Sequence, residues 1–543
     1  MKNCILLILL LISSISKSQE VQLIKIDSIV NSKVSENEPG LMIGIVKDGE
    51  IIYEKYKGLA NVEHQVKIGS KTRSNIASTA KQFTALMVLK LALEKKLNLE
   101  DDFRKYLPNF YPEVKEEIKI RHLINHTSGI RDYVELMGLQ NRIWWKQVGL
   151  NNNDVIELLE KQENLGFSPG KHYSYSNSNY NILAKLIEKV TDKKFTEYSD
   201  DFFMQLGMNS TSFIKFYMQV IPNRAAPYSD WGYGELFHSI SITKTAGEGF
   251  LYTTLEDQLL FEKALQNAKQ NKDTLLMKSQ LPIPNSEIKS YGFGLKLNDR
   301  LGRKAVHHDG VTNAYHAQCL RFPKEKIAIF VMSNNGNLRS DLLADEIAIL
   351  LLKKQNRTPT YNTRYYKDNY RKASIVGQYN YPNDEKLVRI EKENGKTYWK
   401  EGDYFNLEMI SEGVNKFRFA NNPTLKIVFY DDEMVEYYDS GKTMKYKRSR
   451  ALPISSSNIK DFIGSYYNKE LDLSFNLKRS DEGKLNFMFS NDKKWKDVAL
   501  YNNADFFVNG NLFFKANRDN LNKITDILLN YARAKNIKFK KNL

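Results

Sequence analysis

The sequence predicts an α+β fold followed by an all-β region, and two patterns carry this prediction. Up to residue 355, strand-like segments give way to helix formers and then to strands again, an order typical of helices packed against an antiparallel sheet. Beyond residue 370, short runs rich in Tyr, Phe, Asn and Gly alternate with turn dipeptides. With 543 residues and 42% hydrophobic side chains, the chain can bury more than one core.

Residues 1–18 predict a secretory signal peptide. Lys2 provides the positive start, residues 5–12 the apolar stretch and residues 16–18 the cleavage site. The apolar stretch is too short to span a membrane, and no later stretch would do so; a retained anchor is the alternative. We therefore expect a periplasmic or secreted protein with no transmembrane span after signal removal. Only Cys319 would then remain, which excludes an intramolecular disulfide.

The formal net charge of +16 does not by itself indicate nucleic-acid binding. The basic residues are spread along the whole chain and mixed with 64 acidic residues. Outside the cytoplasm, a basic protein is expected to meet anionic cell-wall or envelope polymers through nonspecific attraction. We therefore expect no nucleic-acid partner.

The first region is expected to be built from a few well-marked elements. Residues 40–53 predict a β-hairpin whose turn lies at Asp48-Gly49. The helix that follows Ser78 is apolar on every side, which indicates a helix buried between layers. Further predicted elements are a mostly helical stretch at residues 102–220, strands at 291–297, 315–322 and 327–333, and an amphipathic helix at 338–353.

The second region contains an internal repeat. Ile-Val-Gly-Gln-Tyr at residues 375–379 returns as Phe-Ile-Gly-Ser-Tyr at residues 462–466, and each copy opens a run of short strands. Repetition of one β unit predicts two small barrels or one larger closed barrel, with two unrelated strands as the alternative. We expect a linker at residues 356–370 and β repeats at 371–450 and 451–543. Their expected role is to stabilise or bind, with direct participation in the catalytic cleft as the alternative.

Ser78-Thr79-Ala80-Lys81 is the first motif that indicates chemistry. Positions three apart share one face of a helix, so the Lys81 ammonium can reach the Ser78 hydroxyl. Serine needs an adjacent base to act as a nucleophile, and a partly desolvated lysine can serve. The backbone N–H of Ser78, in the first helical turn, could stabilise an oxyanion. The same spacing recurs elsewhere in this lysine-rich chain, and the apolar helix after it distinguishes this copy.

Tyr175 and Asn177 form the second constellation, after a Ser-Pro-Gly turn at residues 168–170. In an extended or irregular segment, this spacing can direct both side chains at one cleft. A tyrosine beside Lys81 could hold a lowered pKa and relay a proton to or from the leaving group. Asn177 could donate to and accept from a substrate amide. Taken alone, the pattern is also typical of a core or loop tyrosine.

His-His-Asp-Gly at residues 307–310 is the third motif. Gly310 would let a substrate backbone lie close against the strand, and the N–H of Val311 would be a second oxyanion donor. His308 would add positive or hydrogen-bonding character beside Tyr175. Paired histidines also raise the question of a metal, but neighbours on a strand point to opposite faces and no cluster of Cys, Asp or Glu accompanies them. No metal or cofactor is therefore expected.

The three motifs occur in an order that resembles a known superfamily. Residues 25–355 look like the serine β-lactamases and penicillin-binding proteins, nearest to the branch of class C-type β-lactamases, D-aminopeptidases, D-Ala-D-Ala carboxypeptidases and esterases. Residues 120–130 are similar to the family's helix-to-loop signature, and residues 246–254 to its glycine-containing turn, where Glu248 and Phe250 replace the usual small residues. The resemblance implies a β-lactamase/transpeptidase-like domain at residues 19–355, with an antiparallel sheet flanked by helices.

The resemblance implies acyl transfer through an ester on Ser78. Lys81 would match the activating residue, Tyr175 the proton-transfer residue and Asn177 the contact to the substrate amide. His308 replaces a lysine that many family members have, so a fixed charge becomes a pH-dependent one and efficient β-lactam hydrolysis is not expected. No glutamate base of the class A type is identified, so deacylation would reuse Lys81 and Tyr175.

The function expected from the sequence is therefore that of a secreted serine hydrolase that acts on an amide or ester. The expected partner is a small-molecule or peptide substrate, cell-wall-derived material included. Candidate substrates are D-amino-acid peptides, esters and β-lactam-like compounds. One alternative is a penicillin-binding carboxypeptidase with slow deacylation. The other is a catalytically silent binding or sensor protein of the same fold. The tail resembles the β-barrel extensions of some peptidase and esterase members.

Overall fold

The computed structural model describes most of the chain. The predicted signal peptide at residues 1–18 and the predicted linker at 356–370 lie outside the described residues. Among those described, no helix is long and apolar enough to cross a membrane. The described residues are 20–142, 149–231, 234–352, 374–381, 386–401, 405–420, 422–437, 443–449, 459–501, 506–509 and 512–542.

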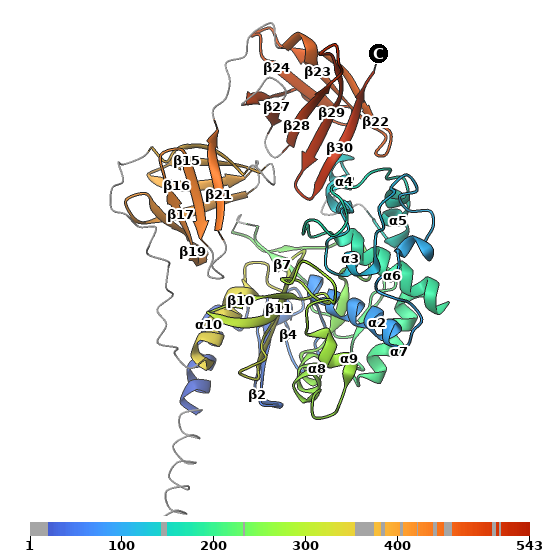
Figure 1. Cartoon of the computed structure of the whole chain (residues 1–543). Coiled ribbons are helices and arrows are strands. Elements are labelled where there is room, and N and C mark those ends of the chain that lie inside the picture. Colours follow the sequence, from blue (N-terminus) through green and yellow to red (C-terminus); the bar gives the residue numbers. More distant parts are fainter. Residues whose placement is uncertain are drawn as a thin grey trace, which may run out of the picture.

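The first region is built on a six-stranded antiparallel sheet (Figure 1). The order places the first hairpin of the region beside its last strand, and the hairpin turns at Asp48-Gly49, where both residues have positive φ angles of 51° and 82°. The α+β class with an antiparallel sheet is thereby confirmed. In sheet order, the strands are β10 (Lys296–Arg300), β11 (Arg303–Thr312), β12 (Tyr315–Phe322), β13 (Ile327–Ser333), β1 (Leu41–Lys47) and β2 (Glu50–Lys57).

Helices cover both faces of this sheet. Successive side chains of β1 point to opposite faces, so Ile43 packs against α10 (Ser340–Leu351) and a helix at residues 20–33, whereas Met42 belongs to the core on the other face. That second core is the larger one. It contains the apolar side chains of α2 (Lys81–Leu93), α8 (Leu255–Asn267) and α9 (Thr274–Ser279).

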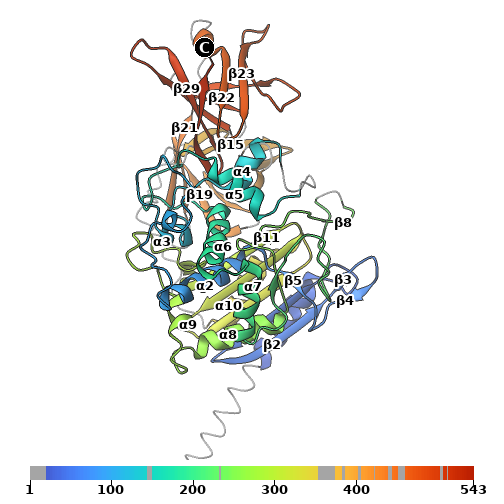
Figure 2. The same ribbon diagram turned by 90° about the vertical axis from the view of Figure 1, so that its right-hand side faces the viewer.

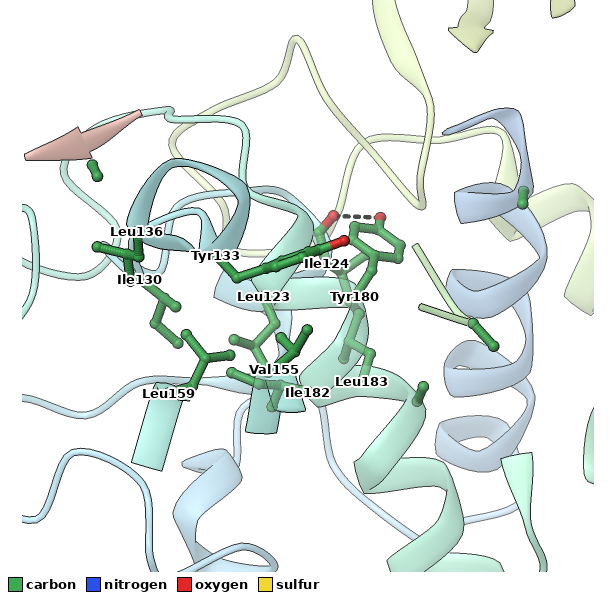
Figure 3. Packing of buried hydrophobic residues seen from close by; sticks show 14 of the residues in the cluster. Leu123, Ile124, Ile130, Tyr133, Leu136, Val155, Leu159, Tyr180, Ile182 and Leu183 are labelled. Carbon is green, nitrogen blue, oxygen red and sulfur yellow. Dashed lines mark hydrogen bonds between the residues drawn. The ribbon is translucent and has the colours of Figure 1, made fainter. Parts of the chain in front are cut away.

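A helical lobe covers the other side of α2, which is buried around nearly its whole circumference as predicted. Figure 3 shows the packing within this lobe, where the Tyr180 hydroxyl also donates a 2.8 Å hydrogen bond to the carbonyl of Ile124. The helices of the lobe are α3 (Ile120–Ile124), α4 (Tyr133–Leu139), α5 (Asn152–Glu160), α6 (Asn177–Thr191) and α7 (Phe195–Gln205).

Small ladders join the loops around the start of α2. The most important is β5-β9-β6, because β5 (Ser74–Asn75) pairs with β9 (Leu251–Thr253) and so brings two distant loops together. The remaining short elements are β3 (Leu59–Asn61), β4 (Val66–Lys67), β6 (Ser212–Phe213), β7 (Tyr228–Ser229), β8 (Phe237–His238), η1 (Ala77–Ala80) and η2 (Phe103–Lys105).

The strand predicted at residues 291–297 is wrong for most of its length, since β10 begins only at Lys296. The preceding residues turn past the start of α2. Gly294 has a φ of 71°, and a Cβ atom there would lie 2.5 Å from the backbone of Lys81. A glycine in the left-handed region lets the two backbones approach this closely, so the segment bends where a continuous strand would collide with the helix.

The C-terminal region consists of two β units, which confirms the all-β prediction. The first is a closed barrel and the second a nine-stranded sheet, and in each unit the first strand pairs with the last (Figure 1). The barrel contains β14 (Gly377–Tyr381), β15 (Lys386–Glu393), β16 (Lys396–Glu401), β17 (Phe405–Gly413), β18 (Lys416–Phe419), β19 (Asn422–Phe429), β20 (Glu433–Tyr437) and β21 (Thr443–Ser449). After η5 (Lys460–Phe462), the second unit contains β22 (Gly464–Asn468), β23 (Leu473–Arg479), β24 (Leu485–Phe489), β25 (Lys496–Asp497), β26 (Ala499–Tyr501), β27 (Phe506–Asn509), β28 (Leu512–Arg518), β29 (Ile524–Tyr531) and β30 (Ala534–Lys541).

The tyrosines of the sequence repeat occupy equivalent places in the two units. Tyr379 is buried and its hydroxyl donates to the carbonyl of Ile375 at 3.0 Å. Tyr466 is likewise buried and donates to the carbonyl of Phe462 at 2.9 Å. The same tyrosine fastens the entry of the first strand in both units, which supports two copies of one β unit over two unrelated strands.

The second unit rests on the helical lobe, above α4 and α5 (Figure 2). Arg131 is buried at this contact and forms an ion pair with Glu470 at 3.0 Å. Its other guanidinium nitrogens donate to the backbone carbonyls of Lys535 and Asn536, each at 2.7 Å. Because a buried guanidinium needs all its partners, this arginine ties the two regions together.

Removing the Arg131 charge should destabilise the protein strongly. Breaking one side of a buried ion pair typically costs about 3–5 kcal/mol, so Arg131→Met should lower the free energy of unfolding in urea by about that much. Arg142→Met is the matched control, because the Arg142 side chain is 42% exposed and its ion pair with Asp154 spans 3.7 Å. An exposed pair contributes about 0–1 kcal/mol. Equal losses in both variants would contradict this role of Arg131.

Candidate active site

The segment that carries Ser78 is a tight turn between a strand and a helix. Ser78 is the second residue of η1, so its backbone N–H has no acceptor within that helix. The residue before it, Ala77, has a positive φ of 47°, which is strained for a residue with a side chain. Asn75 supports the turn by accepting the N–H of Ala77 at 2.8 Å. The turn thus presents the Ser78 hydroxyl and a free N–H at the same point.

Gly310 lies against this turn from strand β11. A Cβ atom at this position would lie 2.4 Å from the carbonyl oxygen of Ile76 and 3.0 Å from the nitrogen of Ser78. Only glycine lets the strand come so close. The structure therefore differs from the expectation that Gly310 makes room for a substrate backbone, because the room is taken by the Ser78 turn itself.

A cavity of about 230 Å³ opens beside Ser78. Five predicted or neighbouring groups contribute to its wall from four parts of the chain. They include Tyr175, Asn177, Glu248, Val311 and Arg533. A larger cavity of about 750 Å³, between helices α5 to α7, contains none of the predicted site residues, so its size does not make it the better candidate.

Lys81 is the first residue of α2 and is completely buried. Its Nζ lies 3.1 Å from Ser78 Oγ and 2.8 Å from Asn177 Oδ1. It also donates to the backbone carbonyl of Glu248 at 2.6 Å. Burial lowers the pKa of Lys81 to about 8, against the opposing effect of the Glu248 carboxylate. A fraction of the molecules therefore carries a neutral amine near neutral pH, directly beside the serine hydroxyl.

Asn177 is the first residue of α6, and its position is fixed from both sides. Its side-chain oxygen accepts from Lys81, while its backbone N–H donates to Asp132 Oδ2 at 2.7 Å. Asp132 is buried at the start of α4. Two helices of the lobe are thus joined at the point where they meet the lysine.

Tyr175 is buried next to Lys81, with the Lys81 Nζ 5.0 Å from its ring centroid. Burial raises the pKa of Tyr175 well above its ordinary value, against the opposing effect of the nearby Ser78 hydroxyl. Its hydroxyl makes no hydrogen bond of good geometry to any described residue. The expectation of a lowered pKa is therefore wrong, because desolvation outweighs the opposing effects of the Ser78 hydroxyl and the Arg533 charge. Tyr175 rests as a protonated donor.

His308 does not supply the pH-dependent charge that its sequence position predicts. Its ring is buried, with Nδ1 2.6 Å from the carbonyl of Asp309 and Nε2 2.9 Å from the hydroxyl of Tyr291. A carbonyl only accepts, so Nδ1 carries the proton and Nε2 accepts from Tyr291. Burial, with a contribution from Lys296, lowers the pKa of His308 to about 3. The ring stands 6.0 Å from that of Tyr175 and is neutral at ordinary pH.

His307 points to the opposite face of β11 and contacts Asn298 and Arg300. Neighbouring strand positions behave in this way, so the two imidazoles do not converge. Among the described residues, no group of three or more His, Cys, Asp or Glu side chains could hold a metal ion.

Glu248 is a site residue whose contacts the sequence did not reveal. Its Oε2 lies 3.3 Å from Lys81 Nζ, and its Oε1 accepts from Tyr133 at 3.0 Å and Thr245 at 2.8 Å. The pairing of β5 with β9 brings its loop to the Ser78 turn. The one available signal was that Glu248 replaces a small residue of the family's glycine-containing turn.

Arg533 is the second such residue, and it comes from the turn between β29 and β30. It lines the Ser78 cavity, 3.1 Å from Asp132 and 2.8 Å from Glu135. The C-terminal region therefore contributes a residue to the cleft, which supports direct participation over a role in stabilisation or binding alone. No local pattern marked this position, because a single arginine in a hairpin turn, 398 residues from Glu135, has no readable spacing.

Comparison with known proteins gives one family and several relatives. The family model described as Beta-lactamase matches residues 26–354. Protein flp of Staphylococcus aureus (strain MRSA252) is 27% identical over 375 residues, which cover 65% of this chain and 71% of that protein. A D-aminopeptidase of Brucella anthropi is 25% identical over 453 residues, or 80% of each chain. The solved octameric penicillin-binding protein homologue from Pyrococcus abyssi shares the fold, with a TM-score of 0.55 and 23% identity over 78% of this chain and 100% of that one.

The neutral state of His308 predicts how stability responds to acid. Below about pH 6.5 the unfolded chain gains a proton at this position, whereas the folded chain gains it only near pH 3. The free energy of unfolding should therefore fall by about 1.4 kcal/mol per pH unit from this group alone, as pH decreases between these values. Urea unfolding of wild type and His308→Gln from pH 7 to pH 4.5 should give a shallower slope for the variant. His64→Gln, at an exposed position, controls for loss of a histidine, and identical slopes for wild type and His308→Gln would contradict the assignment.

The position of Arg533 predicts that the C-terminal region contributes to turnover. Arg533→Met removes the cation that pairs with Asp132, which in turn orients Asn177, so kcat/KM should fall by about 10–100-fold, equivalent to about 1.4–2.8 kcal/mol. Arg518→Met is the matched control from the same sheet, since Arg518 pairs with Asp461 instead. Steady-state kinetics on both variants, with circular dichroism to verify folding, would refute this role if the two lost activity equally.

Proposed function

This chain belongs to the Beta-lactamase family, and on that premise we propose that it is a serine hydrolase that cleaves an amide or ester through an acyl-enzyme on Ser78. The observation that carries the proposal is the contact between Lys81 Nζ and Ser78 Oγ at 3.1 Å, on the wall of an open cavity. A nucleophile within hydrogen-bond reach of a base with a lowered pKa is the arrangement that covalent catalysis requires.

Acylation would begin with neutral Lys81 taking the proton of Ser78. The Ser78 oxygen then attacks the substrate carbonyl, and the N–H groups of Ser78 and Val311 stabilise the developing oxyanion. Tyr175, which rests protonated, donates its proton to the leaving group as the acyl bond to that group breaks. Tyr175 recovers a proton from the Lys81 ammonium, so the proton that left Ser78 ends on the leaving group.

Deacylation would run the same groups in reverse. Water attacks the ester carbonyl and gives one proton to the Tyr175 hydroxyl, which at the same time passes its own proton to neutral Lys81, so that Lys81 is the net base. The Lys81 ammonium then returns a proton to the departing Ser78 oxygen, and the ester bond to Ser78 breaks. Asn177, held between Lys81 and Asp132, would contact the amide of the substrate. His308 carries no charge in this scheme. It supports the site as a neutral ring that accepts a hydrogen bond from the Tyr291 hydroxyl.

We favour small amides of D-amino acids as substrates over esters and β-lactams. The similarity to a D-aminopeptidase over 80% of both chains supports an amide substrate. The cavity of about 230 Å³ is smaller than the pockets that hold drug-sized ligands, which supports a small acyl group. We further propose that the protein acts outside the cytoplasm, on the strength of the predicted signal peptide.

The test is intact-protein mass spectrometry after incubation with a fluorescent penicillin and, separately, a fluorophosphonate. Wild type should gain a single adduct and Ser78→Ala none, because the substitution removes the nucleophile and leaves the surrounding packing unchanged. Preference between the probes separates penicillin recognition from esterase-like chemistry. A penicillin adduct that persists for hours would favour the slowly deacylating carboxypeptidase. Folded wild type without any adduct would support the silent binding protein instead.

A further inference from the structure

Glu248 places a buried carboxylate beside Lys81, the residue proposed to activate Ser78. The residue is 8% exposed and precedes β9, the strand that pairs with the segment leading to Ser78. Its backbone carbonyl and its carboxylate both contact Lys81, at 2.6 and 3.3 Å. One residue thus supplies two of the acceptors around the lysine, and one of these is charged.

Neutral donors hold the carboxylate in this orientation. Tyr133, which packs in the helical lobe of Figure 3, reaches Oε1 with its hydroxyl, and Thr245 donates to the same oxygen. Oε2 is left facing Lys81. Because the two donors are uncharged, they fix the direction of the carboxylate without neutralising it.

We propose that Glu248 is the counter-ion that sets the protonation state of Lys81, and with it the pH at which Ser78 becomes a nucleophile. This inference rests on the proposed function, since it concerns the base of that reaction. Glu248 is a positioning residue in this role, because it acts through Lys81 and not on the substrate.

Several other groups surround the lysine and have to be weighed against Glu248. They come from the helical lobe, from β11 and from the turn between β29 and β30. The groups are Asp132 and Tyr133 of the α4 start, His126 after α3, Tyr175 and Tyr180 near the start of α6, His308 of β11, and Arg533 of the β29–β30 turn.

None of these groups replaces Glu248. Burial lowers the pKa of His126 well below its ordinary value, and that of His308 to about 3, so both rings are neutral. Arg533 and Asp132 form an ion pair with each other, and they shift the pKa of Lys81 in opposite directions. Among the described residues, Glu248 is the one whose carboxylate forms an ion pair with Lys81.

A counter-ion at this place has two opposed effects on the reaction. It stabilises the ammonium form of Lys81, so fewer molecules hold the free amine at a given pH. It also makes the amine a stronger base, which favours the step in which the Ser78 O–H bond breaks and the Lys81 N–H bond forms. Removing the counter-ion should therefore change both the pH dependence and the maximal rate of acylation, which loss of a purely structural role would not do.

Glu248→Gln keeps the shape and removes the charge. The rate of acylation of Ser78 by a fluorophosphonate should be followed by mass spectrometry from pH 5 to pH 10. In the variant, the midpoint of the acid limb should move down by about 1–3 pH units, because the lysine loses its nearest anion. The plateau rate should fall by about tenfold, because the amine that remains is a weaker base.

Glu188→Gln is the matched control. It removes one carboxylate from α6, the helix that begins at Asn177, at a point about 16 Å along the axis from it. Its pH profile should coincide with that of wild type. An acid limb that moves equally in both variants, or in neither, would overturn the inference.

The two levels of the proposal fail differently. If wild type forms no adduct, the proposed serine chemistry itself is wrong. If wild type forms an adduct that Ser78→Ala lacks, but the acid limb of Glu248→Gln coincides with that of wild type, only the role of Glu248 is wrong.

Should Glu248→Gln fail to fold, Glu248→Asp gives the same test. Its shorter side chain withdraws the charge from Lys81 and should move the acid limb in the same direction by less. An unmoved limb there overturns the inference as well.

Discussion

A lysine without access to water is the constraint on which the rest of this structure depends. An ammonium group buried in protein costs several kcal/mol unless partners replace the lost water. The partners of Lys81 are the Ser78 hydroxyl, the side-chain oxygen of Asn177, and the backbone carbonyl and carboxylate of Glu248. Each lies on a different segment, so satisfying one nitrogen requires the Ser78 turn, the start of α6 and the loop before β9 to meet. The contacts that satisfy Lys81 are therefore also contacts that hold these parts of the domain together.

The features that could be predicted from the sequence are those set by residues close together along the chain. The hairpin at Asp48-Gly49 and the contact of Ser78 with Lys81 follow from residues a few positions apart, so turn chemistry and helix spacing were sufficient. Tyr175 and Asn177 reach the same cleft because they sit directly before and at the start of a helix. The family resemblance, resting on three short motifs in order, then supplied the domain around them.

The features that escaped prediction are those decided by surroundings. The charge of His308 depends on burial, which no motif encodes, and the same burial reverses the expected pKa shift of Tyr175. The strand expected before Lys296 does not form because this segment turns past the start of α2, which lies more than 200 residues earlier in the sequence. Glu248 and Arg533 act across long separations. The pairing of β5 with β9 brings Glu248 to the lysine, and the docking of the second β unit on the helical lobe brings Arg533 to Asp132. Spacing along the chain carries no information about such meetings.

The origin of Arg533 has a consequence for the life of the protein before it is complete. A chain is synthesised from its N-terminus, and domains generally fold as they emerge. The serine, its lysine and the surrounding helices are therefore assembled while the hairpin that carries Arg533 has still to be translated. During that interval one wall of the cleft is missing, and Asp132 lacks its ionic partner. The cleft described above is therefore complete only once the second β unit has docked on the helical lobe.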